Sequence, residues 1–508
     1  MAELAETAKH IPTGVPGLDQ VLYGGFLREG FYLVQGDPGS GKTTVALQYA
    51  LSRVKAGERC LYITLTESLR DLRNACDSHG WTLDGLDVCD LTRTAANLAG
   101  EPESSIFHPS ETELGETTKA IIEAVEKAKP DHVVFDGLSE MRLLSGSPLV
   151  YRRQLLALKE FFAERHATVV LLDDGSSPFG DTPPESLVGG NLVFERTLPE
   201  YGRARRRMYV SKVRGSYFQE GFHDYEIVRG GVVVHPRLIA SEHHEAFTRE
   251  TLSSGIENLD SMLSGGLTAG STTLLLGPAG AGKSTIAMQF AISAMRQGYK
   301  AAVYIFDEVI ETLVERVEKL CVGVEQGLRT FIDDGALHVQ QVDPAEKTPG
   351  AFAHEARRAV EAGAKVLILD SLNGYLNAMP EERFLTTHLH ELFSYLNQKG
   401  VVTVIVVAQH GMIIGSGSGG DIDVSYLADT VLLFRYFEAV GEIQQAIGIF
   451  KKRTGAHERY LRQLTISAAG VSIGEPLRNF RGIMSGIPQY SGEGHTIAIG
   501  GTAAGGCP

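Results

Sequence analysis

The sequence predicts two tandem α/β domains, each with a mostly parallel β-sheet that carries helices on both faces. Three observations support this prediction. The chain contains a glycine-rich phosphate-loop pattern twice, the residues around the two copies repeat at a constant spacing, and short apolar runs alternate with helical patterns in both halves. At 508 residues the chain is also too long to fold around a single hydrophobic core.

The repeat is clearest just before the two phosphate loops. Residues 13–19 read TGVPGLD and residues 254–260 read SGIENLD, and in both cases a Gly-Gly pair begins five positions further on. The final aspartates of these segments are 241 positions apart, and the lysines of the two phosphate loops keep the same spacing. A domain-sized period that keeps its register indicates a tandem duplication rather than a solenoid.

Apolar runs and helical patterns alternate along each half. In the first half, strands are expected at residues 31–35, 60–65, 132–136 and 167–172, and helices are expected after the phosphate loop and near 116–128 and 152–165. The pattern changes after Glu195, where residues 207–213 and 231–235 are typical of antiparallel edge strands. The second half repeats the plan, with strands expected at 302–306, 365–370, 401–408 and 430–436.

The domain boundaries follow from the repeat and from local composition. We expect the first domain at residues 1–240 and the second at 248–484, separated by a polar segment without strong periodicity. Residues 485–508 are rich in glycine and other small residues, so a flexible tail is expected there.

Both phosphate loops follow the pattern G-x-x-x-x-G-K-[ST] between an apolar run and a helical pattern. Glycines let such a loop curl until its backbone N–H groups point at phosphate oxygens, and the following helix adds the partial positive charge of its N-terminus. Lys42 and Lys283 are expected to reach the β- and γ-phosphates of ATP. The residues expected to bind ATP are Gly36, Asp37, Pro38, Gly39, Ser40, Gly41, Lys42, Thr43 and Thr44 in the first half, and Gly277, Pro278, Ala279, Gly280, Ala281, Gly282, Lys283, Ser284 and Thr285 in the second.

Asp136 and Asp370 each end an apolar strand pattern. Carboxyl ends of strands in an open parallel sheet face the ligand crevice, so we expect these aspartates to hold Mg²⁺ together with the hydroxyls of Thr43 and Ser284. The alternative is that each aspartate only caps the helix that follows it.

Further acids follow the next strand in each half. Glu67 and Glu308 share the 241-residue register, and Asp307 directly precedes Glu308. Glu67, Asp307 and Glu308 are therefore the candidate catalytic residues that would activate water or a hydroxyl. Helix capping is again the alternative role.

Composition disfavours several classes of protein. The net charge of −15 argues against a dedicated nucleic-acid binder, although residues 203–207 (RARRR) form one basic cluster. No uninterrupted apolar stretch is long enough to span a bilayer, and the N-terminus lacks the apolar core of a signal peptide. The five cysteines form no C-x-x-C pair, so we expect reduced thiols without a zinc site in a cytoplasmic protein.

Nearly the whole chain, from about residue 12 to residue 488, resembles the KaiC family, the circadian-clock ATPases and autokinases among the RecA-like ATPases. The resemblance rests on residues 13–19, both phosphate loops, both strand-end aspartates, residues 212–215 (KVRG) and the closing segments 478–480 (RNF) and 483–486 (IMSG). It implies two RecA-like P-loop domains and a homo-hexameric double ring with ATP at the subunit interfaces. Residues that would then contact the ATP of a neighbouring subunit are Lys212, Arg214, Lys451 and Arg453.

The resemblance also implies different activities for the two domains. In the family, the first ring is mainly a slow ATPase, and the second transfers phosphate to an adjacent serine and threonine. Ser425 occupies the serine position here, whereas Tyr426 occupies the threonine position, and these two are the candidate phospho-acceptors. Asp307 falls on the glutamate that serves as base for autophosphorylation. Thr66 cannot act as a base, so first-domain hydrolysis would depend on Glu67.

The preferred hypothesis is an ATPase that uses Mg²⁺, carries serine/threonine autokinase activity in its second domain and acts as a signalling switch towards regulatory protein partners. One alternative is a recombinase-like or helicase-like DNA-dependent ATPase. The basic cluster supports it only weakly, because no aromatic side chains are interleaved to stack bases. The other alternative is an ATP-binding scaffold with negligible turnover. Neither membrane association nor nucleic-acid binding is expected.

Overall fold

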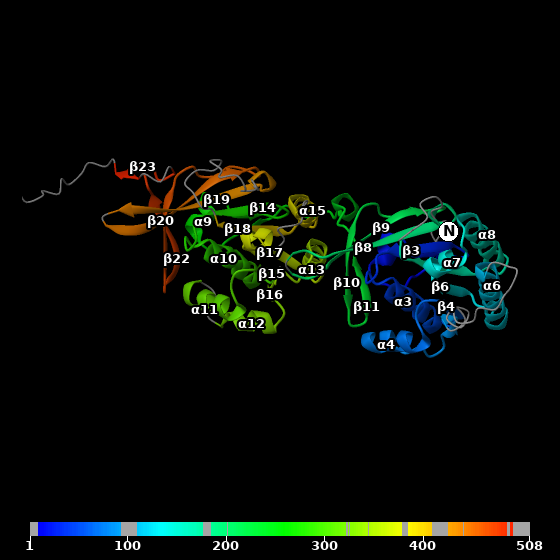
Figure 1. Cartoon of the computed structure of the whole chain (residues 1–508). Helices are drawn as coiled ribbons and strands as arrows, with labels where there is room; N and C mark the ends of the chain where they lie inside the picture. The colour runs from blue at the N-terminus through cyan, green and yellow to red at the C-terminus, as the bar shows by residue number, and fades with distance from the viewer. Residues whose placement is uncertain are drawn as a thin grey trace, which may run out of the picture. The chain divides into compact units, whose positions relative to one another are not determined.

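The structure is a computed structural model of the whole chain. It describes residues 9–92, 109–175, 184–200, 202–321, 324, 326–343, 345–377, 385–408, 425–439, 441–484 and 488–490. The chain divides into two compact units (Figure 1). The first contains Met1–Arg237 together with Thr348–His354, and the second contains Leu238–Lys347 and Glu355–Pro508.

The first unit is built on a nine-stranded sheet in the order β11-β10-β9-β8-β3-β7-β6-β4-β5. Its strands are β3 (Phe31–Gly36), β4 (Cys60–Thr64), β5 (Asp87–Asp90), β6 (His132–Asp136), β7 (Thr168–Asp173), β8 (Gly190–Thr197), β9 (Arg205–Val213), β10 (His223–Val228) and β11 (Gly231–His235). Strands β3 to β8 pair in parallel, and β9 to β11 are added antiparallel. The phosphate-loop strand β3 therefore lies in the middle of the sheet.

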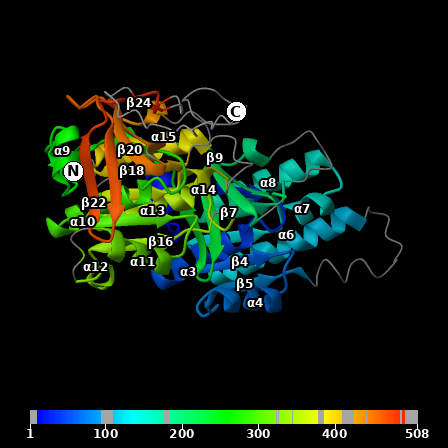
Figure 2. The same ribbon diagram turned by 90° about the vertical axis from the view of Figure 1, so that its left-hand side faces the viewer.

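Helices cover both faces of this sheet (Figures 1 and 2). One face carries α3 (Lys42–Lys55) and α4 (Leu69–His79), and the other carries α6 (Pro109–Ala128), α7 (Leu138–Leu144) and α8 (Pro148–Ala163). Side chains alternate along β3, because Tyr32 and Val34 join the core with α3 whereas Phe31 and Leu33 join the core with α8. Burial on both faces explains why the strands are continuous apolar runs.

The second unit repeats this topology, with the order β16-β15-β17-β18-β14-β19-β20-β21-β22. Its strands are β14 (Thr272–Gly277), β15 (Lys300–Ile305), β16 (Leu337–Gln341), β17 (Ala364–Asp370), β18 (Val402–Ala408), β19 (Thr430–Ala439), β20 (Glu442–Lys452), β21 (Arg462–Ser467) and β22 (Gly470–Pro476). Its helices include α10 (Lys283–Arg296), α11 (Ile310–Leu320), α12 (Leu328–Asp333), α14 (Leu372–Asn377) and α15 (Leu385–Gln398), and residues 355–361 of α13 (Pro349–Glu361) also belong to it. The predicted fold class, two α/β units with mostly parallel sheets covered by helices, is confirmed.

Some details differ from the sequence prediction. Strand β9 was expected at a sheet edge, but it lies between β8 and β10, and only β11 forms the edge on that side. The sequence analysis also missed β5, whose residues are partly exposed beside β4 and lack an apolar run. The predicted tail at 485–508 lies outside the described residues, apart from 488–490. Among the described helices, none has the length and apolar character needed to cross a membrane.

The repeated segments 13–19 and 254–260 have the same structural role in both units. In the first, Asp19 accepts hydrogen bonds of 2.7 Å from both the backbone N–H and the hydroxyl of Thr13. In the second, Asp260 accepts 2.7 and 2.8 Å bonds from the same groups of Ser254. The acid closes a turn before the short helices α2 (Leu18–Val21) and α9 (Glu257–Met262), so this repeat is explained by folding rather than chemistry.

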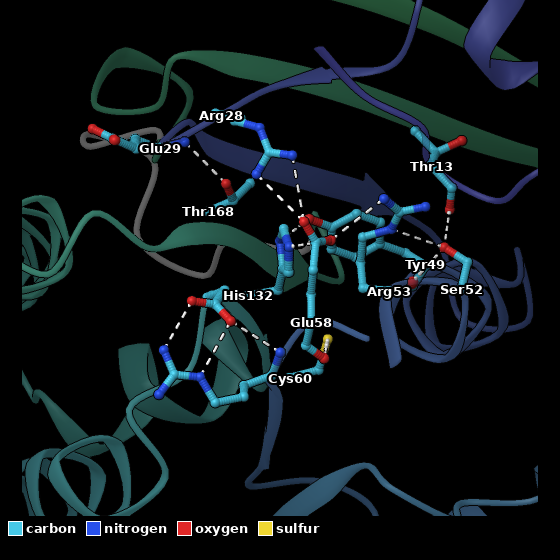
Figure 3. A network of polar contacts seen from close by, with 12 residues as sticks. Thr13, Arg28, Glu29, Tyr49, Ser52, Arg53, Glu58, Cys60, His132 and Thr168 are labelled. Carbon is cyan, nitrogen blue, oxygen red and sulfur yellow. Dashed lines mark hydrogen bonds and ion pairs between the residues drawn. The ribbon is translucent and has the colours of Figure 1, made fainter. Parts of the chain in front are cut away.

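A buried polar network lies at the amino ends of β4 and β6 (Figure 3). His132 is 2% exposed, and its two ring nitrogens lie 2.8 Å from the Tyr49 hydroxyl and 2.9 Å from Glu58. Glu58 also pairs with Arg28 and Arg53. A neutral imidazole can satisfy both contacts, accepting from Tyr49 and donating to Glu58. Burial is the main cause that lowers the pKa of His132, against the opposing effect of Glu58.

This pKa shift predicts acid sensitivity of the first unit. Because the folded state binds a proton on His132 less readily than the unfolded chain, the free energy of unfolding should fall as pH is lowered through about 6.5, by at most about 1.4 kcal/mol per pH unit. Urea unfolding between pH 7.5 and 5.5 measures this slope, and His132→Gln should flatten it. His166→Gln is the control. Glu29 raises the pKa of the exposed His166, so any contribution of His166 to the free energy of unfolding is lost as pH rises rather than as it falls. An equal acid slope in wild type and His132→Gln would contradict the prediction.

Candidate nucleotide sites

Each phosphate loop connects a central strand to a helix, β3 to α3 and β14 to α10, at the carboxyl end of the parallel strands. Gly41 and Gly282, the last residues before these helices, have φ angles of 95° and 91°, in the left-handed region that favours glycine. A Cβ on Gly36 would stand only 2.1 Å from the carbonyl oxygen of Phe194. The glycines therefore allow the backbone to curl as a phosphate-binding loop requires.

The two phosphate-loop lysines have different partners. Lys42 is 9% exposed, donates to the Gly36 carbonyl at 2.8 Å and forms an ion pair with Asp174 at 2.7 Å. Lys283 donates to the Pro278 carbonyl at 2.6 Å, and burial lowers its pKa while Asp370 acts in the opposite direction. The strand register places Ala408 where the first unit has Asp174. Within the described residues, a nucleotide phosphate would thus have to replace a carboxylate at the lysine of the first site but not at that of the second.

Asp136 lies at the end of β6, is 7% exposed and accepts hydrogen bonds from three hydroxyls. These are Tyr62 at 2.7 Å, Thr66 at 3.3 Å and Thr43 at 3.4 Å. Burial raises the pKa of the Asp136 carboxyl, and the three hydrogen bonds counteract the rise. The structure therefore brings together the two residues predicted to bind metal in this site, Thr43 and Asp136.

The second site contains the same pair. Asp370 ends β17, and a hydrogen bond from the Ser284 hydroxyl opposes the rise in its pKa caused by burial. In both sites the carboxylate at the end of a strand, buried at Asp136 and half-buried at Asp370, stands beside the hydroxyl at the start of a helix. These hard oxygen donors suit Mg²⁺, which typically keeps several waters and binds substrate phosphates through one or two carboxylates.

The equivalent glutamates Glu67 and Glu308 have different surroundings. Burial, followed by the charge of Asp136, raises the pKa of Glu67, and a hydrogen bond with Thr43 opposes this effect. Glu308 instead forms an ion pair with Arg316 of α11. The position equivalent to Arg316 in the first unit is Ala75, so Glu67 has no such partner there. Glu67 is therefore the better placed of the two to accept a proton near neutral pH.

Asp307 is held in a defined position in the second site. The hydroxyl of Ser371, the residue after Asp370, donates a 2.6 Å hydrogen bond to its Oδ2. Its side chain is nevertheless exposed. The sequence-predicted acids Asp307 and Asp370 thus lie at the same ends of adjacent strands, since β15 and β17 pair in parallel up to Ile305 and Asp370 and Asp307 follows β15 by two residues.

The remaining predicted residues lie at the opposite end of each sheet from the phosphate loop. Strand β19 begins at Thr430 beside Thr273, whereas the loop follows Gly277, so Ser425 and Tyr426 precede the amino end of the strand. At about 3.3 Å per residue, the four residues from 273 to 277 alone separate the two ends by roughly 13 Å. The structure does not bring Ser425 and Tyr426 to the phosphate loop of their own unit.

The four basic residues predicted to act on a neighbouring subunit share this location. Lys451 donates to the Ala428 carbonyl at 2.7 Å, and Arg453 donates to the Tyr426 carbonyl at 3.3 Å. In the first unit, Lys212 and Arg214 make similar contacts with the carbonyls of Glu185 and Ser186. All four therefore lie at the end of the sheet away from the nucleotide loop of their own unit.

Sequence reasoning missed several residues that contact these sites. They are Tyr62, Asp174, Glu140, Arg316 and Ser371. Asp174 comes two residues after the apolar strand pattern at 167–172, next to Asp173, and could have been found by the strand-end rule that identified Asp136. Tyr62 lies inside a strand, where sequence alone cannot distinguish a core tyrosine from a hydrogen-bond donor.

The topology and the two phosphate loops define the chain as a protein with two P-loop nucleotide-binding domains of the RecA-like ATPase class. A family model described as "ATPase: KaiC" matches residues 11–239 and again 252–478, and the chain belongs to this KaiC ATPase family. Family membership supports ATP binding and an ATPase class of activity, and it confirms the resemblance seen in the sequence.

Individual relatives are similar over nearly the whole length. The circadian clock protein KaiC3 of Synechocystis sp. is 24% identical over 508 residues, covering 97% of each chain. The circadian clock oscillator protein KaiC of Acaryochloris marina is 26% identical over 494 residues, covering 94% of this chain and 91% of the relative. That of Thermosynechococcus vestitus is 26% identical over 488 residues, covering 94% and 92%.

Proposed function

We propose that this protein hydrolyses ATP in its first domain and, in its second, transfers the γ-phosphate of ATP to Ser425 or Tyr426 of a neighbouring copy of the chain in a homo-hexamer. The observation that carries the proposal is the separation of the phosphate loop from residues 425–427 and from Lys451 and Arg453. A nucleotide bound between two copies would meet the loop of one copy and the acceptor segment and cations of the next. Arg453 of the next copy would then stabilise the charge that develops on the transferring phosphate.

The two domains would use their acids differently. In the first, Glu67 has no cationic partner such as Arg316 among the residues that the structure describes, and it could orient or deprotonate an attacking water. In the second, Glu308 is held by Arg316, and Asp307 is the exposed acid that could accept the proton of an acceptor hydroxyl. The hydroxyl oxygen bonds to the γ-phosphorus, and the bond to the β–γ bridging oxygen breaks to release ADP.

Mg²⁺ would be held by Thr43 and Asp136 in the first site and by Ser284 and Asp370 in the second. When bound, it would neutralise charge on the β- and γ-phosphate oxygens. Lys42 and Lys283 would bind the same phosphates, and the phosphate-loop N–H groups would orient them.

The nucleic-acid alternative receives little support from the basic cluster. Arg203 pairs with Glu226 at 3.5 Å, and Arg207 pairs with Glu195 at 3.3 Å. These ion pairs within the domain reduce the charge available for a phosphate backbone. Salt-sensitive DNA binding that accelerates ATP turnover would favour that alternative over the autokinase.

A mixing experiment tests transfer between copies. Lys283→Ala chains keep the phospho-acceptor hydroxyls but lose the phosphate-loop lysine of the site that binds the donor ATP. Ser425→Ala/Tyr426→Phe chains keep that ATP site but lose the phospho-acceptor hydroxyls. We expect Mg-ATP to phosphorylate neither variant alone but to phosphorylate the Lys283→Ala chain in the mixture. Peptide mapping should locate the phosphate at 425 or 426. Consumption of ATP without any phosphate on these residues in wild type would refute the kinase part of the proposal, and the protein would be an ATPase only.

A further inference from the structure

The two nucleotide sites differ in one carboxylate. The second site has Asp307 after β15, and the first site has Thr66 at the equivalent position. The two positions are also equivalent in the structure, because the residue before each makes the same backbone hydrogen bond to the neighbouring strand. Leu65 N–H donates to the Asp136 carbonyl and Phe306 N–H donates to the Asp370 carbonyl, both at 2.9 Å.

The helices after the strand-end aspartates also differ in one carboxylate, but here the first site has the acid and the second site lacks it. Counting from Asp136 and Asp370, Gly137 corresponds to Ser371, and Glu140 of α7 corresponds to Gly374 of α14. The first site therefore has a carboxylate on the helix and, at Thr66, none at the position equivalent to Asp307. The second has a carboxylate after the strand and none on the helix.

The geometry indicates that Glu140 and Asp307 occupy equivalent space. A Cβ on Gly137 would stand 3.3 Å from Glu140 Oε2, and the hydroxyl of the equivalent Ser371 lies 2.6 Å from Asp307 Oδ2. A Cβ on Gly374 would stand 2.6 Å from Phe306 Cβ and 2.8 Å from Asp307 Oδ1, so a side chain at 374 does not fit beside Phe306 and Asp307 as they are placed. Each site thus has one such carboxylate, which comes from a helix in the first site and from the residue pair after a strand in the second.

Glu140 differs from the neighbouring aspartates of this site in having a carboxylate oxygen without a hydrogen-bond partner among the described residues. Asp173 pairs with Arg142 at 2.8 Å, Asp174 pairs with Lys42 at 2.7 Å, and Asp136 accepts three hydrogen bonds from hydroxyls. Oε2 of Glu140 is buried and has no hydrogen-bond partner among the described residues. Burial, followed by the charges of Asp174, Asp136 and Asp173, raises the pKa of Glu140, and its own backbone N–H opposes the rise.

We propose that Glu140 is a catalytic residue of the first nucleotide site, where it takes the place that Asp307 has in the second and accepts the proton of the attacking water. The water oxygen bonds to the γ-phosphorus, the bond to the β–γ bridging oxygen breaks, and its electron pair leaves with ADP. The proton passes to the Glu140 carboxylate and then to solvent. Glu67, the other acid of the site, would then orient this water rather than accept its proton. This inference rests on the proposed hydrolysis of ATP in the first domain.

The test uses full-length Lys283→Ala protein, in which the first site carries the remaining turnover, with Lys42→Ala/Lys283→Ala as the baseline. Adding Glu140→Gln should lower kcat roughly 100-fold while KM for ATP changes less than about twofold. It should also remove the acid limb of the pH–rate profile, since the base acts only above its raised pKa. Glu160→Gln, an exposed change on α8, is the matched control and should leave both measurements unchanged.

A carboxylate swap separates catalysis from folding. Glu140→Gly should be as inactive as Glu140→Gln, and adding Thr66→Asp recreates the arrangement of the second site and should restore turnover at least 10-fold. Unchanged kcat and an unchanged acid limb in Glu140→Gln would overturn the assignment of Glu140. If Lys283→Ala itself turns over no faster than the baseline, first-domain hydrolysis fails, and the role of Glu140 fails with it.

Discussion

Replacing Arg142 with leucine, with Asp173 left in place, is expected to lower the free energy of unfolding of the first domain by about 3–5 kcal/mol. The guanidinium donates hydrogen bonds of 3.0 and 2.8 Å to the carboxylate, and the two side chains are 7% and 1% exposed. The leucine would leave a buried, unpaired negative charge beside Asp174. Urea unfolding at pH 7, followed by the fluorescence of Trp81, measures the loss, because this single tryptophan packs against the core of the first domain.

The second domain supplies the control for this prediction. Leu376 and Val407 occupy the positions equivalent to Arg142 and Asp173, so the duplicated fold accommodates an apolar pair there. Arg142→Leu/Asp173→Val should therefore lose no more than about 1 kcal/mol, because apolar replacement of a buried ion pair is often neutral. Equal losses in the single and double variants would show that packing, rather than the unpaired charge, controls stability at this point.

Signals that depend on local sequence predicted most of the fold. The phosphate loops need glycine at fixed positions, and burial on both faces makes strands such as β6 and β17 visibly apolar. The strand-end aspartates then follow from the sheet topology, which places Asp136 next to Thr43. These features were predictable because each depends on neighbouring residues or on a rule that applies to every parallel sheet.

The residues that distinguish the two sites were not predictable in this way. Arg316 reaches Glu308 from the second turn of α11, and a basic residue in a helix usually indicates only a solvated face. Glu140 stands out as a candidate only when it is compared with Gly374, its equivalent in the second unit, and with Thr66, which replaces the acid Asp307. These positions are far apart in sequence. Only the three-dimensional structure shows that the position on the helix and the position after the strand lie close together in each unit.

Single substitution of the two phosphate-loop lysines should separate the two proposed activities. Lys42→Ala is expected to lower steady-state ATP hydrolysis roughly 100- to 1000-fold at the first site, because it removes a preorganised cation from the developing charge on the phosphates. Phosphorylation at 425 or 426 should persist in this variant. Lys283→Ala should have the opposite effect, abolishing phosphorylation in unmixed protein while most hydrolysis remains.

Release of ADP and phosphate, measured beside phosphopeptide mapping of the same samples, tests this separation. Lys55→Ala is the control, because Lys55 lies on the same helix as Lys42 but is exposed at its far end. The ion pair between Lys42 and Asp174 adds a second expectation. Asp174→Asn should tighten ATP binding at the first site, since the phosphates would no longer have to displace a carboxylate from the lysine. If Lys42→Ala reduced phosphorylation as much as hydrolysis, the two sites would be coupled, and the separate roles proposed for them would be wrong.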